Sequence, residues 1–325
     1  MKKAGIIGSG IAGLASAIRM AVRGYEVHVF EANSYPGGKL CEIQVGDYRF
    51  DAGPSLFTMP KYFEDLFALA GKKFSDYCPY RKLDTITHYF YSDGTRFKTH
   101  ADVQQSAQEM QDKLGIKKET VLEHLDKSKK IFEITADTFL HRSIHTFQNI
   151  TAFDLLKLSS NLGALDLFNT MHDTNTKKLK NEKAIQYFDR FATYNGSNPY
   201  EAPGTLNIIP HLEHHIGAFF PDEGMVAISR SCYNLAVDLG VHFHFNTKVE
   251  EIVVEKNKAI GVKYTAVERI DNKHINIGQM EYMPLDLVIS NMDVAYTYRK
   301  LMPTQKHPEK TLNQPRALSA MVFYL

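Results

Sequence analysis

The chain has 325 residues and a formal net charge of +1, with 44% hydrophobic and 23% charged residues. This length suits two domains with buried cores, and the near-neutral charge gives no electrostatic basis for binding nucleic acid. Cys41, Cys78 and Cys232 are scattered without a Cys-x-x-Cys pair, which disfavours disulfide and zinc sites and fits a reducing cytoplasm. No run of about 18 apolar residues occurs, so no membrane-spanning segment is predicted.

The first part of the chain predicts a strand, a tight turn, a helix and a second strand. Residues 3–8 are apolar and predict the first strand, residues 11–23 the helix, and residues 25–31 the second strand. This order is typical of the opening βαβ unit of a doubly wound, dinucleotide-binding sheet.

The turn carries the pattern Gly8-x-Gly10-x-x-Gly13, and Glu31 ends the second strand. Gly8 allows a sharp turn, Gly10 allows close approach of a pyrophosphate, and Gly13 lets the helix pack closely on the sheet. The helix N-terminus offers N–H groups to phosphates. Glu31 is placed to accept hydrogen bonds from a ribose diol. An Arg close to it in the sequence would indicate a ribose 2′-phosphate, and none is present there.

A second glycine pair, Gly37 and Gly38, follows Glu31 and favours FAD over NAD. With these residues, the chain resembles FAD-dependent desaturases and amine oxidases. Residues 48–55 read Tyr-Arg-Phe-Asp-Ala-Gly-Pro-Ser and resemble the signature of the phytoene (carotenoid) desaturase family. Further similar segments extend the resemblance nearly to the end of the chain: 194–203, 220–225 and 246–252. The chain is most similar to desaturases that act on hydroxylated, already unsaturated carotenoids.

The resemblance implies a set of FAD-binding residues from the turn, the second strand and the segments that follow. The set is Gly8, Ser9, Gly10, Ile11, Ala12, Gly13, Glu31, Ala32, Gly37, Gly38, Lys39, Asp51, Gly53, Pro54, Ser55 and Val249. Two positions depart from the family pattern. Lys39 replaces the usual Arg and lacks its planar fork, and Glu223 replaces a glycine where the backbone would approach the flavin.

The remaining pattern predicts an α/β fold, in which a Rossmann-type FAD-binding domain carries an inserted, largely helical substrate domain. The predicted helices and strands, in chain order, are a helix at 61–69, a hairpin at 83–98, a mostly helical stretch at 103–195, a helix at 226–239, and strands at 241–246, 249–255, 258–265 and 285–291. Residues 1–70 and 216–291 are predicted to form the FAD-binding domain, and residues 71–215 the domain that contacts substrate and membrane. Residues 292–325 are predicted to begin a return to the substrate domain.

Several polar and apolar patterns have competing interpretations. His211 and His215 are four residues apart, but they match no zinc motif, so no metal site is predicted and a polar turn or helix start near the substrate cavity is favoured. His242 and His244 share one face of a strand, which is typical of plain sheet structure. The Leu- and Phe-rich segment 153–168 fits either internal core or a surface that rests on a membrane.

No nucleophile triad is present, and flavin chemistry needs none, because the cofactor accepts a hydride while the protein positions the polyene. Glu213 and Asp173 are polar residues at plausible positions for a catalytic base, but a surface or capping role is favoured for each. The catalytic residues therefore stay open. The resemblance implies an apolar carotenoid substrate and peripheral membrane contact in the cytoplasm, and oligomeric state stays open. The alternatives are another amine-oxidase-type flavoenzyme and an inactive FAD-binding fragment.

Residues 317–325 read as a strand, and residues 250–325 contain no second Gly-rich motif of the kind that the family carries near its C-terminus. We therefore expect residues 1–325 alone to hold FAD weakly and to show no desaturation.

Overall fold

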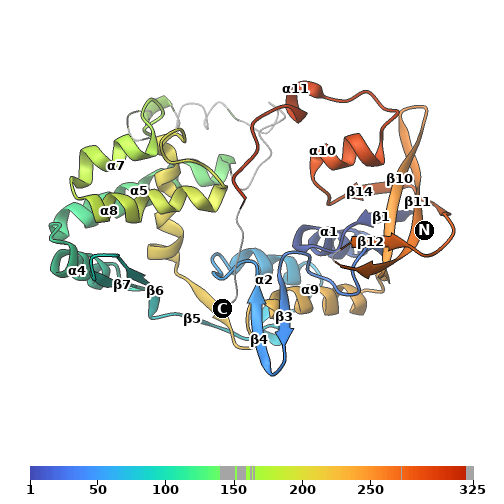
Figure 1. The fold of residues 1–325 in the computed structure, drawn as a ribbon, viewed down its shortest axis with the longest axis horizontal. Helices are drawn as coiled ribbons and strands as arrows, with labels where there is room; N and C mark the ends of the chain where they lie inside the picture. The colour runs from blue at the N-terminus through green and yellow to red at the C-terminus, as the bar shows by residue number, and fades with distance from the viewer. Residues whose placement is uncertain (140–150, 152–158, 162, 164, 272, 320–325) are drawn as a thin grey trace. The chain divides into compact units, whose positions relative to one another are not determined.

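The computed structural model describes residues 1–139, 151, 159–161, 163, 165–271 and 273–319 (Figure 1). They divide into two compact units. The first contains residues 1–81 and 220–315, and the second contains residues 82–219 and a segment that begins at Arg316. The changeovers therefore follow residues 81 and 219, where the sequence analysis placed boundaries after residues 70 and 215.

The first unit is built on a four-stranded parallel sheet in the order β14-β1-β2-β9. Its strands are β1 (Lys3–Ile7), β2 (Glu26–Phe30), β9 (His242–His244) and β14 (Leu287–Ser290). Helices α1 (Ile11–Val22) and α9 (Val226–Asp238) pack against each other, and Figure 1 shows both beside this sheet. Strands β1 and β2 are almost entirely buried, as parallel strands covered on both faces require.

An antiparallel sheet shares the apolar core of the first unit with the parallel sheet. It contains β10 (Thr247–Glu255), β11 (Lys258–Ile270), β12 (Lys273–Asn276) and β13 (Glu281–Pro284). Residues of both sheets form one apolar cluster together with Leu285 and Leu301, which lie outside the strands. The sheet residues in the cluster are Ile7, Phe30, Val249, Ile252 and Val262. Lys256 and Asn257, between β10 and β11, have φ values of 49° and 61°, which is the left-handed pair that tight hairpin turns need.

The rest of the first unit consists of short elements. They are β3 (Cys41–Val45), β4 (Tyr48–Ala52), α2 (Lys61–Ala68), α3 (Phe74–Tyr77), α10 (Val294–Tyr296), η6 (Thr297–Leu301) and α11 (Glu309–Leu312). Strands β5 (Tyr80–Lys82) and β8 (Phe219–Pro221) form a two-stranded sheet.

The second unit is a hairpin followed by helices. Its described elements are β6 (Thr85–Phe90), β7 (Arg96–His100), α4 (Val103–Leu114), α5 (Lys118–Phe139), α7 (Met171–Leu179), α8 (Glu182–Asp189), η3 (Arg190–Asn195), η4 (Gly204–Ile208) and η5 (Leu212–Ile216). Side-chain caps fix the starts of three helices, because Asp102, Thr170 and Asn181 each accept a backbone N–H from the first turn. Aromatic side chains, including Phe97, Tyr187 and Phe188, fill its core.

The predicted elements are confirmed over most of the described chain. The fold class is α/β, and the described part of residues 103–195 is helical. Strand β11 runs beyond the predicted 258–265, and β12 and β13 were not predicted. Residues 317–319 form no strand, in contrast to the expectation for 317–325, and the remainder of that segment lies outside the described residues. No helix in the described ranges is both long enough and apolar enough to cross a membrane.

Candidate functional site

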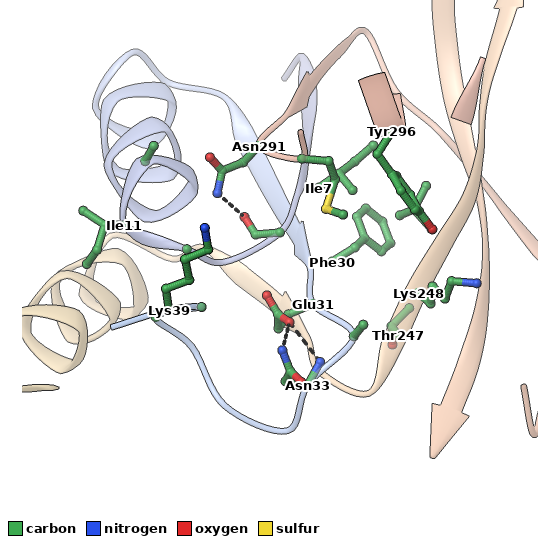
Figure 2. Close-up of a pocket in the computed structure, with 18 of the residues that line it drawn as sticks. Ile7, Ile11, Phe30, Glu31, Asn33, Lys39, Thr247, Lys248, Asn291 and Tyr296 are labelled. Carbon is green, nitrogen blue, oxygen red and sulfur yellow. Dashed lines mark hydrogen bonds between the residues drawn. The ribbon is translucent and has the colours of Figure 1, made fainter. Parts of the chain in front are cut away.

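A pocket of about 670 Å³ lies in the first unit, where the loop after β1 meets the end of β2, the start of β10 and the end of β14. Figure 2 shows Glu31 and Asn33 at one side of this pocket, and Ile7, Phe30 and Tyr296 together at another. The position is the one where open parallel sheets bind ligands, outside the carboxyl ends of their strands.

The Gly-rich turn forms the floor of the pocket, as the sequence predicts for a diphosphate site. Gly8 has a φ of +92°, and a Cβ on Gly13 would lie 2.0 Å from the Gly8 carbonyl oxygen. The helix can therefore approach the strand this closely only because residue 13 lacks a side chain. Gly8, Gly10, Ile11 and Ala12 line the pocket. Helix α1 has no acidic residue in its first turn and no side-chain cap, so its first N–H groups favour an anion.

Glu31 is buried and holds its position through four hydrogen bonds. One carboxylate oxygen accepts the Ser9 backbone N–H and hydroxyl at 2.8 Å each, and the other accepts the Asn33 N–H at 2.9 Å and amide group at 2.8 Å. These donors occupy the acceptor positions of a carboxylate. A further donor would therefore reach this carboxylate only by replacing a side-chain donor from Ser9 or Asn33. Ser9 itself is fully buried and supports Glu31 from behind the pocket wall.

The chain near Glu31 is not free of arginine, because residues remote in sequence reach it. Arg269 Nη1 lies 3.3 Å from the Tyr35 hydroxyl and 3.5 Å from Asn33 Oδ1. His274 Nε2 lies 3.3 Å from the same Asn33 oxygen and also lines the pocket. No Arg lies near Glu31 in the sequence, but Arg269 lies near it in space. Strands β11 and β12 carry Arg269 and His274 to this position.

The glycine pair lies directly against the Gly-rich turn. The Gly37 N–H donates to the Ser9 carbonyl at 2.9 Å, and a Cβ on Gly38 would lie 3.2 Å from the Gly10 Cα. Gly37, Gly38 and Lys39 line the pocket together with Ala32. Lys39 is exposed, so it supplies a positive charge at the pocket wall.

The 51–55 segment supports the pocket more than it lines it. A Cβ on Gly53 would lie 2.0 Å from the Lys39 carbonyl oxygen, and Gly53 has a φ of +90°. Pro54 lines the pocket, whereas Asp51, Gly53 and Ser55 do not. Asp51 accepts a hydrogen bond from Arg49 Nη1 at 3.2 Å. Its carboxylate also lies within 3 Å of where a Cβ on Gly224 would sit, so side-chain space is scarce beside Glu223.

Val249 lines the pocket as predicted, and sequence reasoning missed the residues around it. The missed lining residues are Ile7, Phe30, Asn33, Leu40, Thr247, Lys248, His274, Asn291, Met292, Tyr296 and Leu301. Asn291 follows β14, and its amide nitrogen lies 3.5 Å from the Gly8 carbonyl oxygen. The only sequence signal for Asn291 was the predicted return of a strand to the nucleotide sheet at 285–291.

The residues of this pocket fit a dinucleotide such as FAD. The free helix N-terminus suits a diphosphate, Glu31 suits a ribose, and the apolar walls from Ile7, Phe30 and Val249 suit an aromatic ring. The observation that decides the fit is the close backbone packing around Gly13 and Gly38. A Cβ on Gly13 would meet the Gly8 carbonyl oxygen and a Cβ on Gly38 would meet the Gly10 Cα, so side chains at either position would disrupt the turn that lines the pocket.

The histidine patterns do not form a metal site in the described part of the chain. No group of three or more His, Cys, Asp or Glu residues there is arranged to hold an ion. The rings of His211 and His215 stack at 4.8 Å, and burial lowers the pKa of His211 to about 4. His242 and His244 both stack on His28, at 4.9 and 5.3 Å, which agrees with their predicted shared strand face.

The second unit contains a buried polar cluster that the sequence analysis misread. Glu213 is fully buried and accepts hydrogen bonds from Arg190 Nη2 at 3.0 and 3.1 Å and from the Tyr194 hydroxyl. The expected surface or capping role of Glu213 is therefore wrong. The reason is local, because η5 is a single π-helical turn that directs Glu213 and His214 into the core rather than into a polar turn. Asp173 is exposed in the first turn of α7, as expected.

Comparison with known families gives one match that spans nearly the whole chain. The model of the family described as flavin-containing amine oxidoreductase matches residues 11–319.

Curated relatives and solved structures agree with this match. A 1-hydroxycarotenoid 3,4-desaturase of Flavobacterium sp. (strain P99-3) is 42% identical over 324 residues, which cover 100% of this chain and 63% of that protein. A 4,4'-diapolycopene oxygenase of Methylomonas sp. is 31% identical, with 98% and 62% covered. The chain thus spans about 63% of the length of the first of these relatives.

Two solved structures share the fold at low sequence identity. An oxidoreductase of Methanosarcina mazei has a TM-score of 0.57 at 16% identity, with 95% of this chain and 63% of that chain covered. Cyclohexylamine oxidase from Brevibacterium oxydans has a TM-score of 0.55 at 19% identity, with 96% and 62% covered.

Proposed function

The chain belongs to the flavin-containing amine oxidoreductase family, and from this premise we propose that the protein containing it is an FAD-dependent carotenoid desaturase. The observation that carries the proposal is the pocket of the first unit, whose donor set fits a dinucleotide. The 42% identity to a hydroxycarotenoid desaturase over the full chain supports the choice of substrate class.

In this proposal different residues of the pocket bind different parts of FAD. The first N–H groups of α1, with Lys39 nearby, hold the diphosphate. Glu31 holds the ribose after Asn33 or Ser9 releases one hydrogen bond. The bound flavin supplies a hydride acceptor for a carbon next to a polyene, while a neighbouring carbon loses a proton. The chain itself holds the flavin and the polyene in the relative position that the reaction needs, and it excludes water.

The proposed substrate is an apolar carotenoid that the protein takes from a membrane surface in the cytoplasm. Phe168 is 95% exposed and Leu167 is 45% exposed in the second unit, and these two adjacent apolar side chains support the membrane contact. Leu165, in contrast, is buried, so the Leu- and Phe-rich segment supplies both core and surface. Residues 153–158, 162 and 164 of that segment lie outside the described residues.

An oxygenase is the alternative that the relatives raise, since the Methylomonas relative is named an oxygenase. The two reactions differ in their products, because desaturation removes two hydrogen atoms and adds no oxygen.

The proposal is tested by expressing the protein in a host that accumulates hydroxylated carotenoids and measuring the mass of the extracted pigments. We expect a product that has lost two hydrogen atoms, absent when Gly10→Val is expressed at the same level. A product that has gained oxygen would favour the oxygenase, and unchanged pigments alongside bound flavin would contradict both carotenoid activities.

A further inference from the structure

A second, polar pocket lies in the second unit between α5 and α7, two helices that pack against each other (Figure 1). Its volume is about 310 Å³, which is within the range of small-ligand sites. Helix α5 contributes Glu123, His124 and Lys127, and helix α7 contributes Thr174, Lys177 and Lys178. The spacing of three and four residues places each trio on one helix face. We refer to this site as the α5–α7 pocket.

Two buried polar side chains in its wall have no hydrogen-bond partner among the described residues. His124 is 1% exposed, and neither of its ring nitrogens is bonded. The Thr174 hydroxyl is likewise buried and unbonded. Buried polar groups in folded proteins are nearly always satisfied, so orphan groups in a pocket wall point to a polar ligand. Burial lowers the pKa of His124 to about 3, so its neutral ring offers one donor and one acceptor.

The lysines of the pocket are only partly neutralised. Lys127 pairs with Asp166, and Lys178 pairs with Glu123. Lys177, however, bonds to the side-chain oxygen of Asn169 at 2.7 Å, which carries no charge. Three lysines against two carboxylates leave one net positive charge in the lining. A phosphodiester carries one negative charge and oxygen acceptors for a lysine, a hydroxyl and an imidazole N–H.

Among the described residues of this unit, the most exposed apolar side chain adjoins the pocket. Phe168, which is 95% exposed, directly precedes the lining residue Asn169. An aromatic side chain beside a cluster of lysines is the combination that binds membrane interfaces, since the ring enters the acyl boundary and the lysines meet the headgroups.

We propose that the α5–α7 pocket binds the phosphodiester of an anionic glycerophospholipid while Phe168 inserts beside it. Thr174 and His124 then bond the phosphate or the headgroup hydroxyls, and Lys177 supplies the uncompensated charge. This inference rests on the proposed membrane contact and makes it selective for lipid headgroups.

The test is the binding of the purified protein to vesicles of phosphatidylcholine alone and of phosphatidylcholine with phosphatidylglycerol at about 4:1. The wild-type protein should bind the mixed vesicles more tightly. Lys177→Gln should lower that affinity about fivefold, the effect of about 1 kcal/mol per lysine near an anionic surface, and leave binding to phosphatidylcholine unchanged. Lys130→Gln is the matched control, because Lys130 is exposed on α5 outside the pocket lining.

Two further variants separate the pocket from general surface charge. Thr174→Val removes a hydroxyl without changing charge, and it should also reduce selectivity for the mixed vesicles. Phe168→Ser should weaken binding to both vesicle types. Thermal unfolding identifies any variant that fails to fold, and the Lys177 and Lys130 comparison then decides the outcome.

Equal losses for Lys177→Gln and Lys130→Gln would overturn the inference in favour of diffuse surface charge. Equal binding to both vesicle types would overturn it while the proposed membrane contact stands, and no binding to either would overturn both. Stabilisation of the protein by soluble glycerol phosphate without any vesicle preference would assign the pocket to a soluble anion instead.

Discussion

Replacing Glu213 by Gln should destabilise the protein far more than replacing an exposed glutamate. The Glu213 carboxylate is fully buried, and Arg190, whose side chain is 30% exposed, donates to both of its oxygens. The Tyr194 hydroxyl donates to it as well, and burial together with the Glu213 charge raises the pKa of Tyr194, which keeps that donor protonated. The substitution leaves the Arg190 charge in the interior without its counter-charge.

The magnitude follows from burial. Breaking a buried ion pair by removing one partner costs about 3–5 kcal/mol, and we expect about 3 kcal/mol, at the lower end, because water reaches part of Arg190. Glu251→Gln is the control, since Glu251 pairs with Lys263 at 2.8 Å with both side chains about 40% exposed. That surface pair is worth about 0–1 kcal/mol.

The assay is urea unfolding of the single variants and of the Arg190→Met, Glu213→Gln double variant, followed by circular dichroism. The double variant should recover part of the loss, because it removes the uncompensated charge as well as its partner. A loss for Glu213→Gln no larger than that for Glu251→Gln would refute the reasoning, as would strict additivity in the double variant.

Two further predictions concern packing and pH. Gly13→Ala should destabilise the protein by about 1–3 kcal/mol through overpacking, since its Cβ would lie 2.0 Å from the Gly8 carbonyl oxygen. The control is Gly163→Ala, because a Cβ on Gly163 would meet none of the described residues within 4 Å, and equal unfolding midpoints for the two variants would count against the prediction. Burial lowers the pKa values of His124 and His214 to about 3, so the unfolded chain binds more protons than the native protein below about pH 6.5, the ordinary histidine pKa. The free energy of unfolding should therefore fall between about pH 6.5 and 5, by up to about 1.4 kcal/mol per pH unit for each histidine, and urea titrations that show constant stability over this interval would contradict the burial of these rings.

The part of the site that local pattern encodes was predicted from the sequence. Gly8, Gly10 and Gly13 mark a strand, a turn and a helix, because each glycine is required by the backbone of that turn. Glu31 and the pair Gly37 and Gly38 follow at short distances along the same chain segment. Such signals are local, so one sequence is enough to read them.

The rest of the site depends on which distant segments meet, and a single sequence does not encode that. Thr247, His274 and Asn291 line the pocket because β10, β12 and β14, all remote in sequence from β1 and β2, bring them there. Arg269 reaches Asn33 for the same reason. Glu213 was misread because its neighbours look polar, whereas the π-helical turn that contains it sends its side chain into the core.

The central claim is that the pocket around the Gly-rich turn holds FAD, and titration of the purified protein with FAD tests it most directly. A valine at position 10 would place a branched side chain in the pocket wall, with its Cβ 3.1 Å from Asn291 Nδ2. We expect FAD to bind the wild-type protein and the Gly163→Val control alike, and to bind Gly10→Val at least about tenfold more weakly, a loss of about 1.4 kcal/mol. Unchanged FAD affinity in a folded Gly10→Val variant, or no FAD binding by the wild-type protein, would contradict it.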